Sequence, residues 1–296
     1  MTQAGFWRNY QPNNNQLILG NYKGVANQVH YLFPDGNGPG SAFTTFTALA
    51  PNLRSRDVII LGGVLAEQAI APLGVFDVLV IGAANLPRQA TANGVPTGGG
   101  ATWTYPASGA VASQANIEIR EQGWTFENIF FNSYTTAPGI KMTRAETATY
   151  PDPSFATIRG CRFTGVDGIV DSGGCHDYLV DDCEFFGLTG TGIKSIAGAA
   201  IADSLQNTIR KSFFNRNANN IVTAASHCLI EDNRMIHTTT QKVKLSGLGY
   251  NYVINNGFED VEADIDISHG YTGISTDVWR NYSKDVAAQT VGYATT

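Results

Sequence analysis

One six-residue pattern recurs along the chain, and it constrains the fold more than any other feature. In each copy an apolar residue is followed by two polar residues, a small residue, a variable residue and a large apolar residue. The copies are 126–131, 158–163, 180–185, 209–214, 230–235 and 254–259. The first five depart from the pattern only at Ile129 and Gly160, and the sixth slips by one residue near its end. Repeats at such a spacing, with insertions of variable length, are typical of solenoids, whose units bury their apolar faces against each other.

A second short apolar segment follows each copy. These segments are 139–142, 168–170, 192–194, 220–222, 242–245 and 264–267. Most are centred on a β-branched residue and several alternate apolar and polar side chains, which favours β-strands over helices. A coil of about 22 residues with two or three short strands is typical of a parallel β-helix. The sequence therefore predicts an all-β, single-stranded parallel β-helix, with side loops at insertions such as 195–206.

Stacking of the coils predicts which side chains become neighbours. Adjacent strands lie about 4.8 Å apart, so equivalent positions of successive coils touch. The second position of the repeat alternates in charge, as Glu127, Arg159, Asp181, Arg210, Glu231 and then Asn255. The fourth position is mostly small, as Ile129, Cys161, Cys183, Ser212, Asn233 and Gly257. We therefore expect a ladder of paired charges in one column and a tight interior stack in the other.

The repeat is fainter towards the N-terminus. Residues 57–63 and 77–82 are similar strands that align from Asp57 and Asp77, and 117–120 is a strand before the first clear copy. The Gly-, Pro-, Ser- and Thr-rich segment 93–109 is expected to leave the solenoid as a loop, and 42–50 to form a short capping helix. The predicted organisation is an N-terminal arm or cap at 1–23, a β-helix domain at 24–285 and a C-terminal tail at 286–296.

Composition excludes several classes of partner. Charged residues make up 15% of the chain, the net charge is −6 and there is no basic cluster, so nucleic acid is not an expected partner. The sequence has no apolar run long enough to cross a bilayer and its start is polar, so we expect neither a membrane span nor export by the usual secretory route. No cofactor is expected.

The cysteines and one acidic strand are the candidates for a metal site. The four cysteines, 161, 175, 183 and 228, have neither the spacing of zinc ligands nor a geometry that favours disulfides, so buried free thiols are expected. Glu262, Asp264 and Asp266 alternate along one strand and are the best local candidates for binding a hard cation such as calcium. A solvated acidic face is the expected alternative.

The chain resembles the right-handed parallel β-helix group typified by pectate lyases and bacteriophage tailspikes. The resemblance covers about Tyr31 to Ser283 and rests on the six repeats and on the entry Phe33–Gly36, followed by 42–50 and 57–63. This group includes lyases, hydrolases, esterases and inert spikes, so the resemblance implies a fold and leaves the function open. Phage members are commonly homotrimers, and some decorate the phage head.

A polysaccharide lyase or hydrolase of this group would need carboxylates that converge on one groove. The acids considered are Asp181, Asp182, Glu184, Asp203, Glu231 and Asp232. Pairing with arginines of neighbouring coils explains most of them, which leaves Asp203, Asp182 and Asp232 as weak catalytic candidates. The five histidines are scattered and lie near no nucleophile motif. The sequence therefore predicts no catalytic set.

Outward aromatic residues indicate an interface. The fifth position of the repeat contains Phe130 and Phe213, with Phe258 close to the same register, and exposed phenylalanines are usually covered by something. The predicted N-terminal arm also contains aromatic residues, Phe6, Trp7 and Tyr10. We expect these residues to contact other subunits or a larger assembly, with sugar stacking or loop cover as alternatives.

The leading hypothesis is a homotrimeric phage protein that decorates or cements the capsid by binding the major capsid protein or another virion protein. It would be located in the virion and assembled in the host cytoplasm. The alternatives are a tail spike that binds a surface polysaccharide, and a polysaccharide lyase or hydrolase.

Overall fold

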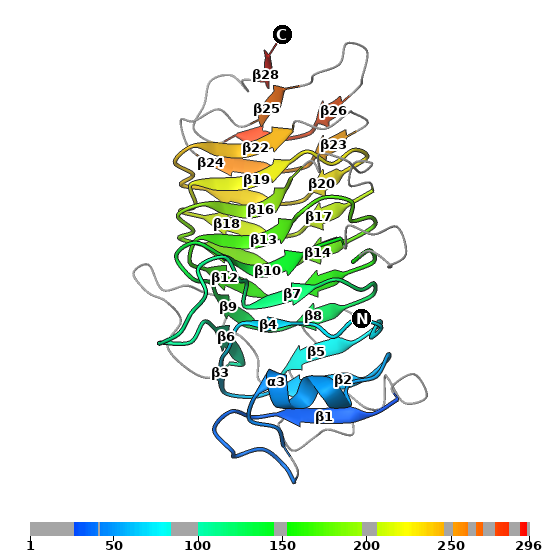
Figure 1. Ribbon diagram of the computed structural model, residues 1–296. Coiled ribbons are helices and arrows are strands. Elements are labelled where there is room, and N and C mark those ends of the chain that lie inside the picture. Colours follow the sequence, from blue (N-terminus) through cyan, green and yellow to red (C-terminus); the bar gives the residue numbers. More distant parts are fainter. Residues whose placement is uncertain are drawn as a thin grey trace.

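A computed structural model describes residues 27–40, 42–83, 100–144, 153–196, 206–245, 251–259, 265–268, 276–283 and 291–294. Within them the chain winds through three parallel β-sheets that form the sides of one elongated solenoid (Figure 1). The cap lies at one end with β1 and β2, and β28 lies at the other. Each coil adds one strand to each sheet, which is the predicted parallel β-helix.

The first sheet contains ten described strands. In spatial order these are β1 (Val29–Leu32), β2 (Val58–Leu61), β5 (Leu79–Gly82), β8 (Thr125–Glu127), β11 (Thr157–Arg159), β14 (Leu179–Asp181), β17 (Thr208–Arg210), β20 (Leu229–Glu231), β23 (Asn251–Ile254) and β26 (Thr276–Trp279). Ile158 pairs with Val180, Val180 with Ile209, and Ile209 with Ile230. All four are fully buried, so they form the single interior row that the repeat predicts.

The second and third sheets have nine described strands each. The second sheet consists of β3 (Val64–Ala66), β6 (Thr102–Thr104), β9 (Phe130–Asn132), β12 (Arg162–Thr164), β15 (Glu184–Phe186), β18 (Phe213–Asn215), β21 (Arg234–Ile236), β24 (Gly257–Glu259) and β27 (Tyr282–Ser283). The third sheet consists of β4 (Ala69–Ile70), β7 (Ile117–Ile119), β10 (Pro138–Met142), β13 (Asp167–Asp171), β16 (Thr191–Ser195), β19 (Asn219–Thr223), β22 (Gln241–Leu245), β25 (Ile265–Ser268) and β28 (Val291–Ala294). The second predicted strand of every repeat is thus a strand of the third sheet.

The corner between the first and second sheets is a single left-handed residue in each coil. The third position of the repeat has φ between 52° and 59° in Asn128, Gly160, Asp182, Lys211, Asp232 and Asn255. Only glycine, and to a lesser degree Asn and Asp, adopts this conformation readily. The third position is therefore polar because it turns the chain outside the core.

Aromatic and amide ladders fill the interior. Phe131, Phe163, Phe185 and Phe214 stack with centroids 4.6 to 5.2 Å apart and planes within 9° of parallel. Further along, the side-chain Oδ1 of Asn256 accepts hydrogen bonds from the main-chain N–H and the Nδ2 of Asn233, both at 3.0 Å. Such stacking satisfies buried amides from one coil to the next.

The register corrects two alignments made from the sequence. Val253, not Ile254, pairs with Ile230. The sixth copy therefore starts at residue 253 and reaches its large apolar residue, Phe258, without a slip. Ile254 replaces Asn255 in the second column, where it departs from the polar pattern, and Asn256 replaces Gly257 in the fourth. Val58 pairs with Leu79, so the alignment of Asp57 with Asp77 was wrong by one position.

Two further corrections concern segments expected to lie outside the solenoid. Residues 102–104 form β6 within the second sheet, where Trp103 is fully buried, so the segment 93–109 returns to the solenoid. β28 pairs with β25, so the solenoid extends past the predicted boundary at 285. The predicted arm at 1–23 lies outside the described residues.

The capping helix is confirmed but shorter than predicted. It consists of α3 (Phe46–Leu49) and the 3₁₀ turn Ala50–Asn52. The Glu67 carboxylate accepts the main-chain N–H groups of Phe46 at 2.6 Å and Thr47 at 2.9 Å, which holds the start of the helix against the solenoid. Phe46 then packs against Trp103 in the core.

Candidate functional site

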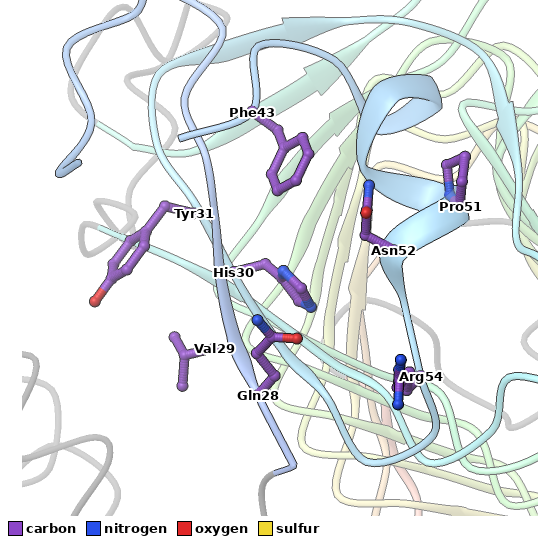
Figure 2. Close-up of a pocket in the computed structure, with 8 residues that line it drawn as sticks. All are labelled: Gln28, Val29, His30, Tyr31, Phe43, Pro51, Asn52 and Arg54. Atoms are coloured by element: carbon purple, nitrogen blue, oxygen red, sulfur yellow. The ribbon is translucent and has the colours of Figure 1, made fainter. Parts of the chain in front are cut away.

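A pocket of about 330 Å³ opens beside the terminal strand β1, next to the cap. Its lining comes from β1 and from the segments that flank the helix: Gln28, Val29, His30, Tyr31, Phe43, Pro51, Asn52 and Arg54. Figure 2 shows His30 on the same side of β1 as Phe43, Asn52 and Arg54, with Tyr31 directed to the other side. Strand alternation explains this split.

A buried His–Asp pair supports one wall of this pocket. The His30 Nε2 lies 2.9 Å from the Asp57 Oδ2, and the two side chains are 5% and 0% exposed. The same oxygen accepts the main-chain N–H of Arg54 at 2.8 Å, whereas Oδ1 of Asp57 has no hydrogen-bond partner in the described structure. The Phe43 ring meets the imidazole edge to face, with centroids 6.1 Å apart.

This arrangement orients the imidazole, and Arg54 contributes a cationic group to the pocket lining. A carboxylate bonded to one ring nitrogen holds the imidazole in one orientation, as in histidines that take part in proton transfer. The residues that line the pocket include His30 and Arg54 and no acid. Within the described segments, no three His, Cys, Asp or Glu residues converge as a metal site would require.

The three weak catalytic candidates do not converge in the described residues. Asp182 and Asp232 both occupy the left-handed corner, and the coil between them places Lys211 in the same column. Asp203 lies outside the described residues. The corner is therefore a row of alternating charge and not a carboxylate pair.

The predicted charge ladder is confirmed along the outside of the first sheet. Arg159 lies 3.6 Å from Glu127 on one side and 3.2 Å from Asp181 on the other, and Arg210 lies 3.1 Å from Asp181. Burial raises the pKa of Glu127, and the nearby Arg159 offsets this in part. These carboxylates are therefore paired with arginines of neighbouring coils.

A second ion pair crosses the second sheet. Arg162 Nε donates to the Glu184 carboxylate at 2.9 Å, and the side chains are 2% and 12% exposed. Glu184 lies between Arg162 and Phe213 in its column, as predicted. This acid too has a structural partner.

The predicted metal candidates are only partly within the described residues. Glu262 and Asp264 lie outside them, and Asp266 is placed as a residue of β25 with no description of its side chain. All four cysteines are buried, and none of them forms a disulfide. Burial raises the pKa of both Cys161 and Cys228 to about 12, which suits thiols that act as small apolar groups.

Two of the predicted interface aromatics are corrected by their burial. Phe258 pairs with Met235 in the interior and is 1% exposed, because the sixth copy starts one residue earlier than predicted. Phe130 faces outward but is only 6% exposed, so it is already covered within the chain. Phe213 remains half-buried on the outer face, with the Arg234 guanidinium 5.9 Å from its ring centroid. Phe6, Trp7 and Tyr10 lie outside the described residues.

Exposed apolar side chains concentrate at the N-terminal end of the solenoid. Among the described residues, eight large apolar side chains are exposed, and five of them lie between residues 64 and 111. These five are Val64, Ile70, Leu73, Phe76 and Val111, which we call the N-terminal apolar girdle. They come from β3, from β4, from the turn that leads to β5 and from the loop before β7, so they lie on more than one side of the solenoid.

Sequence reasoning missed both the pocket and the girdle. His30 and Asp57 belong to successive coils that lack the six-residue pattern, so nothing in the sequence aligned them. The one available signal was Asp57, an acid immediately before a buried apolar strand. The next coil has Asp77 near this position, but its register places Asp77 one residue away from Asp57. The girdle residues gave no signal because single exposed apolar residues are common on protein surfaces.

Comparison with known proteins identifies a fold and no family. No family of protein sequences and no curated protein matches the chain. An alginate lyase from Paenibacillus sp. str. FPU-7 superposes with a TM-score of 0.51 at 12% identity, over 88% of this chain and 96% of that one. PfbA, a surface adhesin of Streptococcus pneumoniae, gives 0.51 at 13% identity, over 79% and 62%. The Dettilon tailspike protein gives 0.39 at 13% identity, over 86% and 68%.

The fold is a right-handed parallel β-helix. It is the type of solenoid that the resemblance implied, and the alginate lyase and PfbA share it. Identities of 10–13% show a shared fold alone. In the described part of the chain, no helix is long and apolar enough to span a membrane.

Proposed function

We propose that this chain is a structural protein of a phage particle, a homotrimer that decorates or cements the capsid and docks through the N-terminal end of its solenoid. The observation that carries this proposal is the N-terminal apolar girdle. Its members are 36% to 57% exposed, whereas the described surface from Thr125 onward exposes only Phe155, Ile196 and Tyr252 among large apolar residues. Exposed apolar side chains concentrated around one end of a protein support docking of a partner at that end.

The body of the solenoid supports a structural role. Acids that a glycan-cleaving enzyme would direct into a groove are paired with arginines of the next coil. The stacked phenylalanines and asparagines continue from coil to coil, which makes a stiff rod. A stiff rod with exposed apolar residues near one end is suited to binding a capsid surface through that end.

Co-sedimentation of the purified chain with particles of the virus that encodes it tests the proposal. Replacing Leu73 and Phe76 by serine should abolish binding to undecorated particles, while replacing Ile196 and Tyr252 by serine should leave binding intact. Light scattering should give the mass of a trimer. A monomer that does not bind the particles would contradict the proposal. An equal loss of particle binding in the two double variants would also contradict it.

Glycan binding or cleavage, by a tail spike or a lyase, is the second candidate. The observation that favours it is the His30–Asp57 pair in an open pocket, an arrangement suited to a general base. Incubation with acidic polysaccharides, followed by measurement of chain length, tests it. Cleavage that disappears in His30→Ala or Asp203→Asn would favour this candidate over the first.

A further inference from the structure

The pocket beside β1 contains a positive charge that no described residue balances. The Arg54 side chain is exposed and makes no ion pair or hydrogen bond with the described part of the chain. Asp57, which lies three residues further on, is already bound by His30 and by the main-chain N–H of Arg54. An arginine side chain without a partner among the described residues, in a pocket whose lining residues include no acid, favours an anionic group.

We propose that this pocket receives the carboxylate of an acidic side chain from the protein on which the N-terminal end docks. The inference rests on the proposed function and identifies the chemistry of the partner at that end. Arg54 forms the charged contact, and the side-chain amides of Gln28 and Asn52 lie on the same lining as further donors. Figure 2 shows these three side chains around His30.

One member of the apolar girdle, Phe76, lies beside the segment that follows Arg54, which favours a protein over a sugar as the occupant. Ser55, the residue after Arg54, accepts the main-chain N–H of Phe76 on its Oγ at 3.1 Å. Arg56 then donates its own N–H to the Phe76 carbonyl at 3.0 Å. One partner can therefore cover Phe76 and reach Arg54 together, and a buried apolar centre with a charged anchor is typical of protein interfaces.

The size and position of the pocket fit a peptide segment. Its volume of about 330 Å³ is at the small end of ligand sites, enough for one acidic side chain and adjacent backbone. β1 is the last strand of the first sheet in the described structure, and an extended peptide can lie along such a strand. Phe43 and Pro51 provide an apolar wall for the stem of the side chain.

Calorimetric titration of the full chain tests this inference with three probes. The probes are a short blocked peptide with a central glutamate, the same peptide with glutamine, and free galacturonic acid. The glutamate peptide should bind about tenfold or more tightly than the glutamine peptide, because a charged hydrogen bond is lost in the latter. Arg54→Gln should remove this preference. Arg56→Gln is the matched control, since its 64% exposed side chain is two residues away and lies 4.0 Å from Asp77.

The outcomes separate this inference from the proposed function. Equal binding of the two peptides, equal loss in both arginine variants, or binding of galacturonic acid alone would overturn the carboxylate pocket. If particle binding needs Leu73 and Phe76 but is unchanged by Arg54→Gln, the docking role stands and the pocket inference falls. If the protein prefers the glutamate peptide but the wild-type chain does not bind the particles, the pocket inference is supported and the docking role is contradicted.

Discussion

The ring of Phe163 stacks on the ring of Phe185 with centroids 4.9 Å apart and planes 7° from parallel. The spacing is close to the distance between neighbouring strands, so each coil contributes one ring to the stack. Phe131 and Phe214 extend the column on either side. Coil-upon-coil registry is therefore enforced by side chains as well as by the sheets.

Phe163→Ala should lower the free energy of unfolding by roughly 3–5 kcal/mol, because it opens a cavity and removes two ring contacts. Phe186→Ala, on the half-buried outer side of β15, should cost clearly less. Chemical denaturation of both variants measures the difference. Similar losses would mean that the interior column is not the main source of stability.

Gly168 and Gly257 form a matched pair for testing the packing of the interior. A Cβ at Gly168 would lie 2.5 Å from the Gly192 carbonyl oxygen and 2.8 Å from the Phe185 ring, whereas a Cβ at Gly257 meets nothing within 4 Å. Gly168→Ala should cost at least about 1–3 kcal/mol because the obstructing atom belongs to the backbone. Gly257→Ala should be tolerated. Thermal unfolding of the two variants measures the difference in stability. Equal melting temperatures would contradict the register of the interior.

The repeat predicted most of the fold because each column is chemically uniform. A row such as Ile158, Val180 and Ile209 needs apolar side chains in every coil, so the sequence displays the period. The error at the sixth copy arose where two apolar residues, Val253 and Ile254, adjoin and either could occupy the interior position. That one-residue shift also placed Phe258 on the wrong side, because successive strand residues point to opposite faces.

The candidate site was not predictable in the same way. The charge ladder was predicted because Glu127, Arg159 and Asp181 recur at the period of the fold. The pocket depends instead on one contact between His30 and Asp57 and on a cap that occurs once. Features that occur once in a solenoid leave no periodic trace.

The buried thiols should resist modification until the chain unfolds. The pKa of Cys161 and that of Cys228 are raised to about 12 by burial, so the thiolate is scarce at neutral pH and the sulfur is inaccessible. Titration with a thiol reagent should detect almost no reactive group in the native protein and all four after denaturation. Fast reaction of the native protein would contradict this description of the interior.

Glu127→Gln should stabilise the protein at neutral pH, and the gain should depend on pH in a defined direction. Burial raises the pKa of Glu127 above its ordinary value of 4.5, and the attraction of Arg159 is the smaller effect. A carboxyl with a raised folded-state pKa contributes its full stability below the ordinary value and loses it as pH rises through the folded value.

The stability difference between Glu127→Gln and wild type should therefore increase from pH 4 upward and then level off, because only the wild type must ionise this buried group. Arg159 keeps Asp181 as a partner at 3.2 Å in the variant, so no cation is left unpaired. Urea unfolding of both proteins across this pH range measures the difference. The contributions of the other carboxylates are the same in both proteins and cancel in the difference. A difference that decreases with rising pH would mean that the ion pair with Arg159 outweighs desolvation at this position.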